Sequence, residues 1–164
     1  MKPIRLLLAG LALIGLSGCY TSEQALIGDG DAVASFAKIT FQGRGDDDEP
    51  ATFARDGTSY LASGEGGDMR LHLKPVEGDF YVAQLSGEGG DGETQYLYAY
   101  MRLDAEAKVA ETWKTVGTEA DVRPGLRECK DGICIDDLDA YIAYAKEGIA
   151  AGNAPDTTFD IVVE

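Results

Sequence analysis

The chain has 164 residues, a length that fits one domain at roughly 100–200 residues per domain. Hydrophobic residues make up 45% of it and charged residues 26%, which excludes a wholly disordered chain and a polytopic membrane protein. Its 14 basic and 29 acidic residues give a net charge of -15 and exclude nucleic acid as a main partner, because phosphate backbones are bound by clustered lysine and arginine.

The first residues have the anatomy of an export leader. Lys2 and Arg5 precede the apolar stretch Leu6–Leu16, and Ser17-Gly18-Cys19 closes it. This stretch is much shorter than the about 20 residues that span a bilayer. We therefore expect residues 1–18 to be a signal peptide. An ordinary secretory leader that ends in a cysteine by chance is the alternative.

Leu16-Ser17-Gly18-Cys19 resembles the lipobox of bacterial lipoproteins. In that family the cysteine thiol is acylated, the leader is cut just before it, and the new amino terminus is acylated too. The resemblance implies that Cys19 is a membrane anchor and not a disulfide partner, since two or three lipid chains hold a protein stably. Tyr20 is similar to the residue that follows the cysteine in lipoproteins sorted to the outer membrane of Gram-negative hosts. The expected location is therefore the periplasmic face of that membrane.

The processed chain is expected to comprise a lipidated tether at residues 19–32 and a single acidic β-rich domain at residues 33–164. Without Lys2 and Arg5, 12 basic residues face 29 acidic ones, a net charge of -17. Such a field attracts cations or basic proteins without selecting one of them.

A period of two runs through residues 33–116 and predicts half-buried strands. The connections are rich in glycine and aspartate, and no long helix intervenes. This pattern favours a mainly β (α+β) fold, an antiparallel meander that forms a sandwich or a partly closed barrel. The expected strands are 35–42, 52–54, 60–62, 69–74, 79–85, 94–103, 108–116 and a closing strand at 157–163.

One hexapeptide occurs twice, at residues 63–68 and 86–91, each time between two expected strands. We interpret both copies as flexible hairpin connections. Matching acidic loops that offer a ligand site are the alternative. Arg44-Gly45-Asp46, which precedes three more acidic residues, is interpreted as a solvated acidic turn.

Tyr96, Tyr98 and Tyr100 share one face of an expected strand, and aliphatic side chains occupy the other face. If the aliphatic face meets the core, the tyrosines form an outward row and a possible binding surface. If the tyrosine face meets the core, the rings pack there with their hydroxyls reaching out. Both arrangements remain open at this stage. Trp113 is expected in the core.

Cys129 and Cys134 are expected to form a disulfide, because export places them where disulfides persist. Asp131-Gly132 is a preferred type I′ turn and would put the two cysteines directly opposite each other on a hairpin. A redox-active pair is the alternative, but four residues separate the cysteines, not the two of thioredoxin-like motifs.

A helix at about residues 136–151 follows this hairpin. Asp136 or Asp137 is suited to cap it, and Gly152 ends it. Apolar residues recur at helical spacing. They are Leu138, Tyr141, Ile142, Ala145 and Ile149.

Catalysis is not expected, and neither is a metal or other cofactor. The only histidine, His72, is expected on a solvent-exposed strand face, and no Gly-x-Ser-x-Gly elbow occurs. A hydrolase that uses a Ser-His-Asp set or paired carboxylates is kept as a second alternative.

The combined expectation is a lipid-anchored, extracytoplasmic, non-catalytic binding or envelope-accessory module that meets another envelope protein or a small ligand. An inhibitor of a cationic cell-wall hydrolase such as lysozyme is the first alternative. The chain is faintly similar to the small lipoprotein lysozyme inhibitors, which share an anchor, a compact barrel and a disulfide. Ser86-Gly87-Glu88 and Trp113-Lys114 echo motifs of that family at a different spacing, so no inhibitory residue is carried over.

Overall fold

The structure is a computed structural model that describes residues 19–64, 67–130 and 132–164. The expected leader, Glu65-Gly66 of the first hexapeptide and Asp131 of the expected turn lie outside the described residues. The elements are β1 (Cys19–Ser22), β2 (Lys38–Gln42), β3 (Ala51–Asp56), β4 (Ser59–Gly64), β5 (Gly67–Glu77), β6 (Phe80–Glu88), β7 (Thr94–Asp104), β8 (Val109–Trp113), the 3-10 turn η1 (Glu119–Asp121), β9 (Leu126–Cys129), β10 (Gly132–Ile135), α2 (Leu138–Ala150) and β11 (Thr157–Val163).

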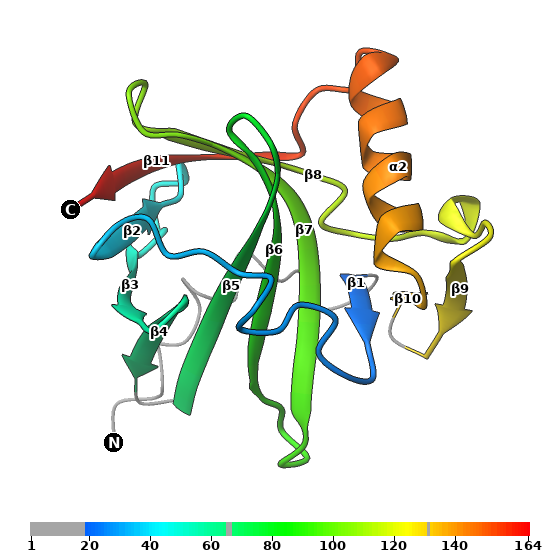
Figure 1. Ribbon diagram of the computed structural model, residues 1–164, viewed down its shortest axis with the longest axis horizontal. Helices are drawn as coiled ribbons and strands as arrows, with labels where there is room; N and C mark the ends of the chain where they lie inside the picture. The colour runs from blue at the N-terminus through cyan, green and yellow to red at the C-terminus, as the bar shows by residue number, and fades with distance from the viewer. Residues whose placement is uncertain (1–18, 65–66, 131) are drawn as a thin grey trace.

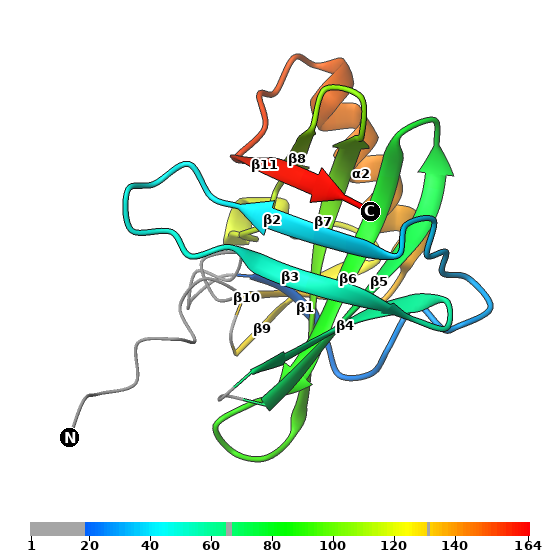
Figure 2. The same cartoon turned by 90° about the vertical axis from the view of Figure 1, so that its left-hand side faces the viewer.

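Eight antiparallel strands close into a barrel. Strands β2 to β8 follow one another as a meander, β11 inserts between β8 and β2, and the pairing of β6 with β7 completes the ring. Figure 2 shows β11, β2 and β3 crossing in front of β5 to β7. The mainly β fold and the antiparallel meander are confirmed, and the barrel is closed, not partly open or a sandwich.

Local sequence signals set several of these strands. β11 has the predicted bounds, 157–163. β3 and β4 form the predicted hairpin, in which Asp56 pairs with Ser59 and Gly57 adopts a φ of 65°. Glycine suits this position because side chains rarely adopt positive φ.

The barrel interior is filled by side chains from every strand of the ring. On β5, Leu71 and Leu73 point inward, as the alternation predicted. This barrel core consists of Ile39, Phe41, Phe53, Tyr60, Leu71, Leu73, Ala83, Leu85, Met101, Leu103, Ala110, Phe159 and Ile161.

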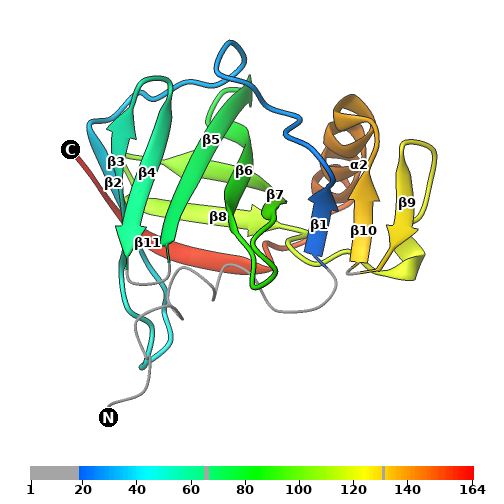
Figure 3. The same ribbon diagram turned by 90° about the horizontal axis from the view of Figure 1, so that it is seen from below.

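A second layer lies against the outer face of the barrel. β1 pairs with one edge of β7, and β10 and β9 extend the sheet from there. In Figures 1 and 3 the helix α2 stands beside these short strands, to one side of the barrel. The second core between the layers consists of Tyr20, Ile27, Ala32, Val82, Tyr98, Tyr100, Leu126, Ile133, Ile135, Tyr141 and Ala145.

The helix begins at the second of its two predicted caps. Asp137 Oδ1 accepts hydrogen bonds from the backbone N–H groups of Asp139 at 2.9 Å and Ala140 at 3.3 Å. This capping satisfies two amides that the helix itself leaves without partners. Gly152, at a φ of 88°, follows the last turn as predicted. Tyr141 and Ala145 are buried in the second core.

The expectation of a tether at residues 19–32 was wrong. Residues 19–22 form β1, and residues 23–33, here called the strap, cross the outer face of the barrel with Ile27 and Ala32 buried. Gln84 Oε1 accepts from the N–H groups of Leu26 and Ile27, both at 2.9 Å, and Val33 N–H donates to the Leu73 carbonyl at 2.9 Å. Burial and backbone hydrogen bonding therefore hold residues 19–33 against the barrel.

Candidate functional site

The short strand β1 brings together all three groups of residues that the sequence singled out. Its Tyr20 pairs with Tyr98 of β7, and its Thr21 pairs with Cys134 of β10. Cys19, the predicted anchor, is the first residue of the same strand. Cys19, the tyrosine row and the disulfide thus meet around one strand, although both disulfide cysteines lie more than 100 residues after Cys19.

Cys19 is buried and lines an apolar cavity of about 50 Å³ on the inner side of the sheet. Side chains of β2, β3, β6 and β7 form the walls, including Phe41, Phe53, Ala83 and Ala99. Burial raises the pKa of the Cys19 thiol. The thiol form is therefore favoured there. Lipidation of Cys19 stays a prediction.

Cys129 and Cys134 form the predicted disulfide, with Cα atoms 5.8 Å apart. The predicted register was wrong, because Cys129 pairs with Gly132, and Cys134 pairs with Arg127. The cysteines are diagonal neighbours and not directly opposite, yet the Cα separation is within the range that a disulfide spans. Thr21 Oγ1 lies 3.5 Å from Cys134 Sγ and 3.7 Å from Cys129 Sγ, which joins the disulfide to β1.

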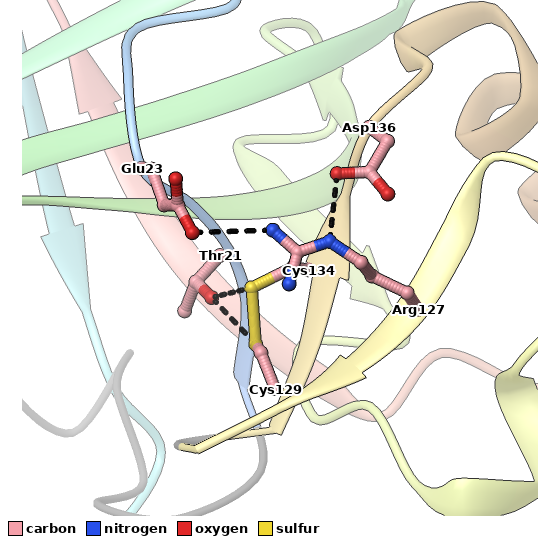
Figure 4. Close-up of a disulfide and its surroundings, with 6 residues drawn as sticks. All are labelled: Thr21, Glu23, Arg127, Cys129, Cys134 and Asp136. Atoms are coloured by element: carbon pink, nitrogen blue, oxygen red, sulfur yellow. Dashed lines mark hydrogen bonds and ion pairs between the residues drawn. A yellow bond between two sulfur atoms is a disulfide. The ribbon is translucent and has the colours of Figure 1, made fainter.

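An ionic clamp lies next to the disulfide. In Figure 4, Arg127 points toward Glu23 on one side and Asp136 on the other. Its Nε donates to Asp136 at 3.0 Å and its Nη2 to Glu23 at 3.2 Å, and these hydrogen bonds raise its pKa. The three side chains border a polar pocket of about 360 Å³. The clamp fastens the strap to the β9–β10 hairpin at a solvent-exposed place.

The tyrosine row packs inside the molecule and does not form an outward binding surface. Tyr98 is 3% exposed and Tyr100 1%, while Tyr96 is half-buried. The aliphatic side chains opposite them line the barrel, so both faces of β7 are covered. Tyr98 Oη donates to Gln84 Oε1 at 2.9 Å, and the N–H of Leu26 donates to Tyr98 Oη at 3.1 Å. The tyrosines therefore hold the strap in place.

A buried carboxylate network, which sequence reasoning missed, lies between β1 and α2. Asp121 is 4% exposed; the Tyr144 hydroxyl donates to it, as does Thr118 N–H at 2.9 Å. Burial raises the pKa of Asp121, but these hydrogen bonds outweigh burial and leave the pKa below its ordinary value. Lys114 Nζ lies 3.7 Å from the same carboxylate.

The buried Tyr20 ring packs on Tyr141, with ring centroids 5.1 Å apart. In the described part of the chain, neither of their hydroxyls meets a hydrogen-bonding partner in good geometry. Burial raises the pKa of both tyrosines. This cluster offers no charged group to solvent and is suited to holding β1 against the helix.

His72 is buried, contrary to the expectation of an exposed face. The strap covers it, and its Nε2 lies 3.2 Å from Asp29 Oδ1 in the strap. Alternation did place His72 outside the barrel, but sequence patterning gave no sign of the covering segment. Trp113 is in the core as predicted, with Nε1 donating to the Asn153 carbonyl at 2.9 Å.

Acidic side chains collect at one end of the barrel, here called the acidic end. Because consecutive antiparallel strands alternate in direction, the β2–β3, β4–β5 and β6–β7 connections share this end. Arg44, also there, pairs with Asp160 at 2.7 Å. The exposed acids of these connections and their flanking residues are Asp46, Asp47, Glu49, Asp68, Glu88, Asp91 and Glu93.

Residues 19–64, 67–130 and 132–164 contain no group of three or more His, Cys, Asp or Glu side chains arranged to hold a metal ion. Within these same ranges, no helix is long and apolar enough to cross a membrane. Comparison with known proteins finds no matching family model, no matching curated protein and no matching solved structure.

Proposed function

We propose that this chain is a lipoprotein, anchored through Cys19 at the periplasmic face of a Gram-negative outer membrane, and that it acts by contact and not by catalysis. One observation carries the proposal. Leu16-Ser17-Gly18-Cys19 resembles a lipobox, and cleavage just before Cys19 would keep every described strand and the helix in the product.

The anchoring step is a transfer from an activated lipid to the thiol. A bond forms between Cys19 Sγ and a lipid carbon, the bond between that carbon and its leaving group breaks, and the thiol proton is lost to the medium. Hydrolysis of the peptide bond before Cys19 then releases the leader and an amino group. The thiolate is the reactive form, and burial raises the pKa of the Cys19 thiol in the folded domain. The lipid is therefore attached before β1 pairs with its neighbours.

The filled interior supports a contact function. The apolar cavity of about 50 Å³ is far below the roughly 300–1,000 Å³ of small-molecule sites. This leaves little room for a carried ligand inside the barrel. The polar pocket beside Arg127 has a volume of about 360 Å³, which is large enough for a small polar ligand. Such a ligand is therefore a second class of partner.

The acidic end favours one specific second candidate, an inhibitor of a cationic cell-wall hydrolase. Charge of one sign at a single end steers a basic protein toward it. Ser86-Gly87-Glu88 ends β6 and Trp113-Lys114 ends β8, and both strands run toward this end. Trp113 is buried and Lys114 faces Asp121, so neither is offered as an inhibitory group.

The anchor is tested by mass spectrometry of the amino-terminal peptide from protein isolated from its own membranes. The expected mass is that of a peptide starting at Cys19 with two or three acyl chains. The Cys19→Ser variant is expected to keep its leader and to leave the membrane fraction on alkaline washing. An unmodified Cys19 in the wild-type protein would refute the anchor.

The partner is tested by crosslinking in the native envelope, and the second candidate by titrating a basic lysozyme with the domain. Inhibition that weakens several-fold in Asp47→Asn/Glu49→Gln, but not in Asp79→Asn/Glu106→Gln, would support inhibition through the acidic end. All four acids are exposed, and only the first pair lies at that end. If both double variants weaken binding equally, the binding reflects general charge attraction and not a site at the acidic end.

A further inference from the structure

We propose that the apolar cavity beside Cys19 seats the first carbons of the lipid attached to its Sγ, so that the attachment point is built into the barrel. This inference rests on the proposed lipid anchor. It goes beyond the anchor because a lipoprotein with a flexible tether would leave the cavity empty and β1 unpaired.

The side chain of Cys19 points toward the barrel. Alternate residues of a strand face opposite sides of the sheet, and Tyr20 is fully buried in the second core on the outer side. Cys19 and Thr21 therefore face inward. Thr21 meets the disulfide, and Cys19 lines the cavity together with inward residues of β2, β3, β6 and β7.

The backbone of Cys19 is held on both sides. It pairs with Gly132 of β10 in a parallel ladder and forms an antiparallel bridge with Val116. The next residues pair with β7, and the strap beyond them is bound to Gln84. Swinging Cys19 out toward a membrane would break its pairing with β10 and its bridge to Val116. An atom added to Sγ must therefore begin its path inside the cavity.

The cavity fits the start of a lipid and nothing larger. Its walls are almost wholly apolar, and the small side chains Ala83 and Ala99 leave the space. Its volume of about 50 Å³ is near a third of the roughly 150 Å³ cavity that holds a benzene molecule, which corresponds to two or three carbon atoms. The cavity is partly open, so the acyl chains would continue outward through its opening.

Hydrogen exchange on the lipidated protein, extracted in mild detergent, tests the proposal. Mass spectrometry of the same sample first establishes the lipid on Cys19. The amides of residues 20–22 are then expected to exchange as slowly as those of residues 133–135 in β10. Fast exchange of β1 beside a protected β10, in protein whose mass includes the lipid, would overturn the cavity seat and leave the anchor standing. A missing lipid would instead refute the anchor.

A cavity-filling variant gives a second, independent readout. Ala99→Leu, or the milder Ala99→Val, is expected to speed exchange of β1 at least tenfold in the lipidated protein, because the new side chain competes with the lipid carbons. In the Cys19→Ala background, which carries no lipid, the same substitution should leave β1 protected. Ala143→Leu on the exposed side of α2 is the matched control and should have no effect in either background. Equal effects of Ala99→Leu in both backgrounds would overturn the proposal.

Discussion

The barrel core and the second core hold the molecule by different means. Apart from β11, the barrel joins strands that follow one another in the chain, and mainly aliphatic and phenylalanine side chains fill it. The second core gathers the strap, the outer faces of β6 and β7, and residues 126–145. It contains four fully or almost fully buried tyrosines and Gln84. The barrel is thus specified by local pairing, and the second layer by distant contacts that include the hydrogen bonds of Gln84.

The largest effect is expected in the barrel. Phe53 is 1% exposed and lies edge-on to Phe41, with ring centroids 6.0 Å apart. Phe53→Ala should lower the free energy of unfolding by about 3–5 kcal/mol, since it removes a ring from a packed interior. Urea denaturation followed by circular dichroism measures this. Val162→Ala, at an exposed position of β11, is the control and should cost less than about 0.5 kcal/mol.

The second core should respond instead to the loss of hydrogen bonds. Gln84→Leu keeps the volume but leaves the N–H and the carbonyl of buried Ile27 without their partners, while Leu26 N–H keeps Tyr98 Oη as an acceptor. We expect a loss of roughly 2–4 kcal/mol, from two buried backbone groups without partners. Exchange of the strap amides should accelerate more than exchange within the barrel. Gln95→Ala, at an exposed position of β7, should leave both regions unchanged, and a uniform acceleration would contradict the division into two regions.

The disulfide should contribute less than either core. It joins residues only five positions apart, so it restricts the unfolded chain by about 2 kcal/mol. Replacement of both cysteines by serine should lower the free energy of unfolding by that amount. Comparing denaturation of oxidised and reduced wild-type protein checks the value. A loss above 5 kcal/mol would mean that the second layer depends on the bond for its formation.

The smallest effect is a pH dependence from Asp121. Since hydrogen bonds from Tyr144 and Thr118 hold its pKa below the ordinary value, ionised Asp121 stabilises the fold above the ordinary carboxyl pKa. This stability is lost as the pH falls through the lowered pKa. Asp121→Asn should therefore be less stable than wild type at pH 7, and the difference should shrink toward pH 2.

Local patterns in the sequence predict most of the barrel and the helix. The alternation at Leu71 and Leu73, the turn at Gly57 and the cap at Asp137 each depend on nearby residues only, and all were predicted. The same reasoning treated β7 as a strand with one covered face. Both faces are covered, because α2 and the strap arrive from other parts of the chain.

The parts that could not be predicted depend on long-range contacts. β1 is a four-residue polar strand next to the expected leader, so its sequence resembles a linker. Its burial comes from Tyr20 packing on Tyr141, which lies 121 positions later. The spacing of the cysteines indicated a bond but not the hairpin register, since diagonal and opposite pairs both bring sulfur atoms within reach.

The order of the sheet also has a consequence for self-association. The barrel closes on itself, so among the described residues the sheet ends at β9, whose outer edge has no neighbouring strand. An uncovered edge is a template for aggregation. β9 is four residues long and exposes Arg127 and Glu128, which makes it a poor template. Short length and charge at this one edge help to keep neighbouring molecules from polymerising edge to edge.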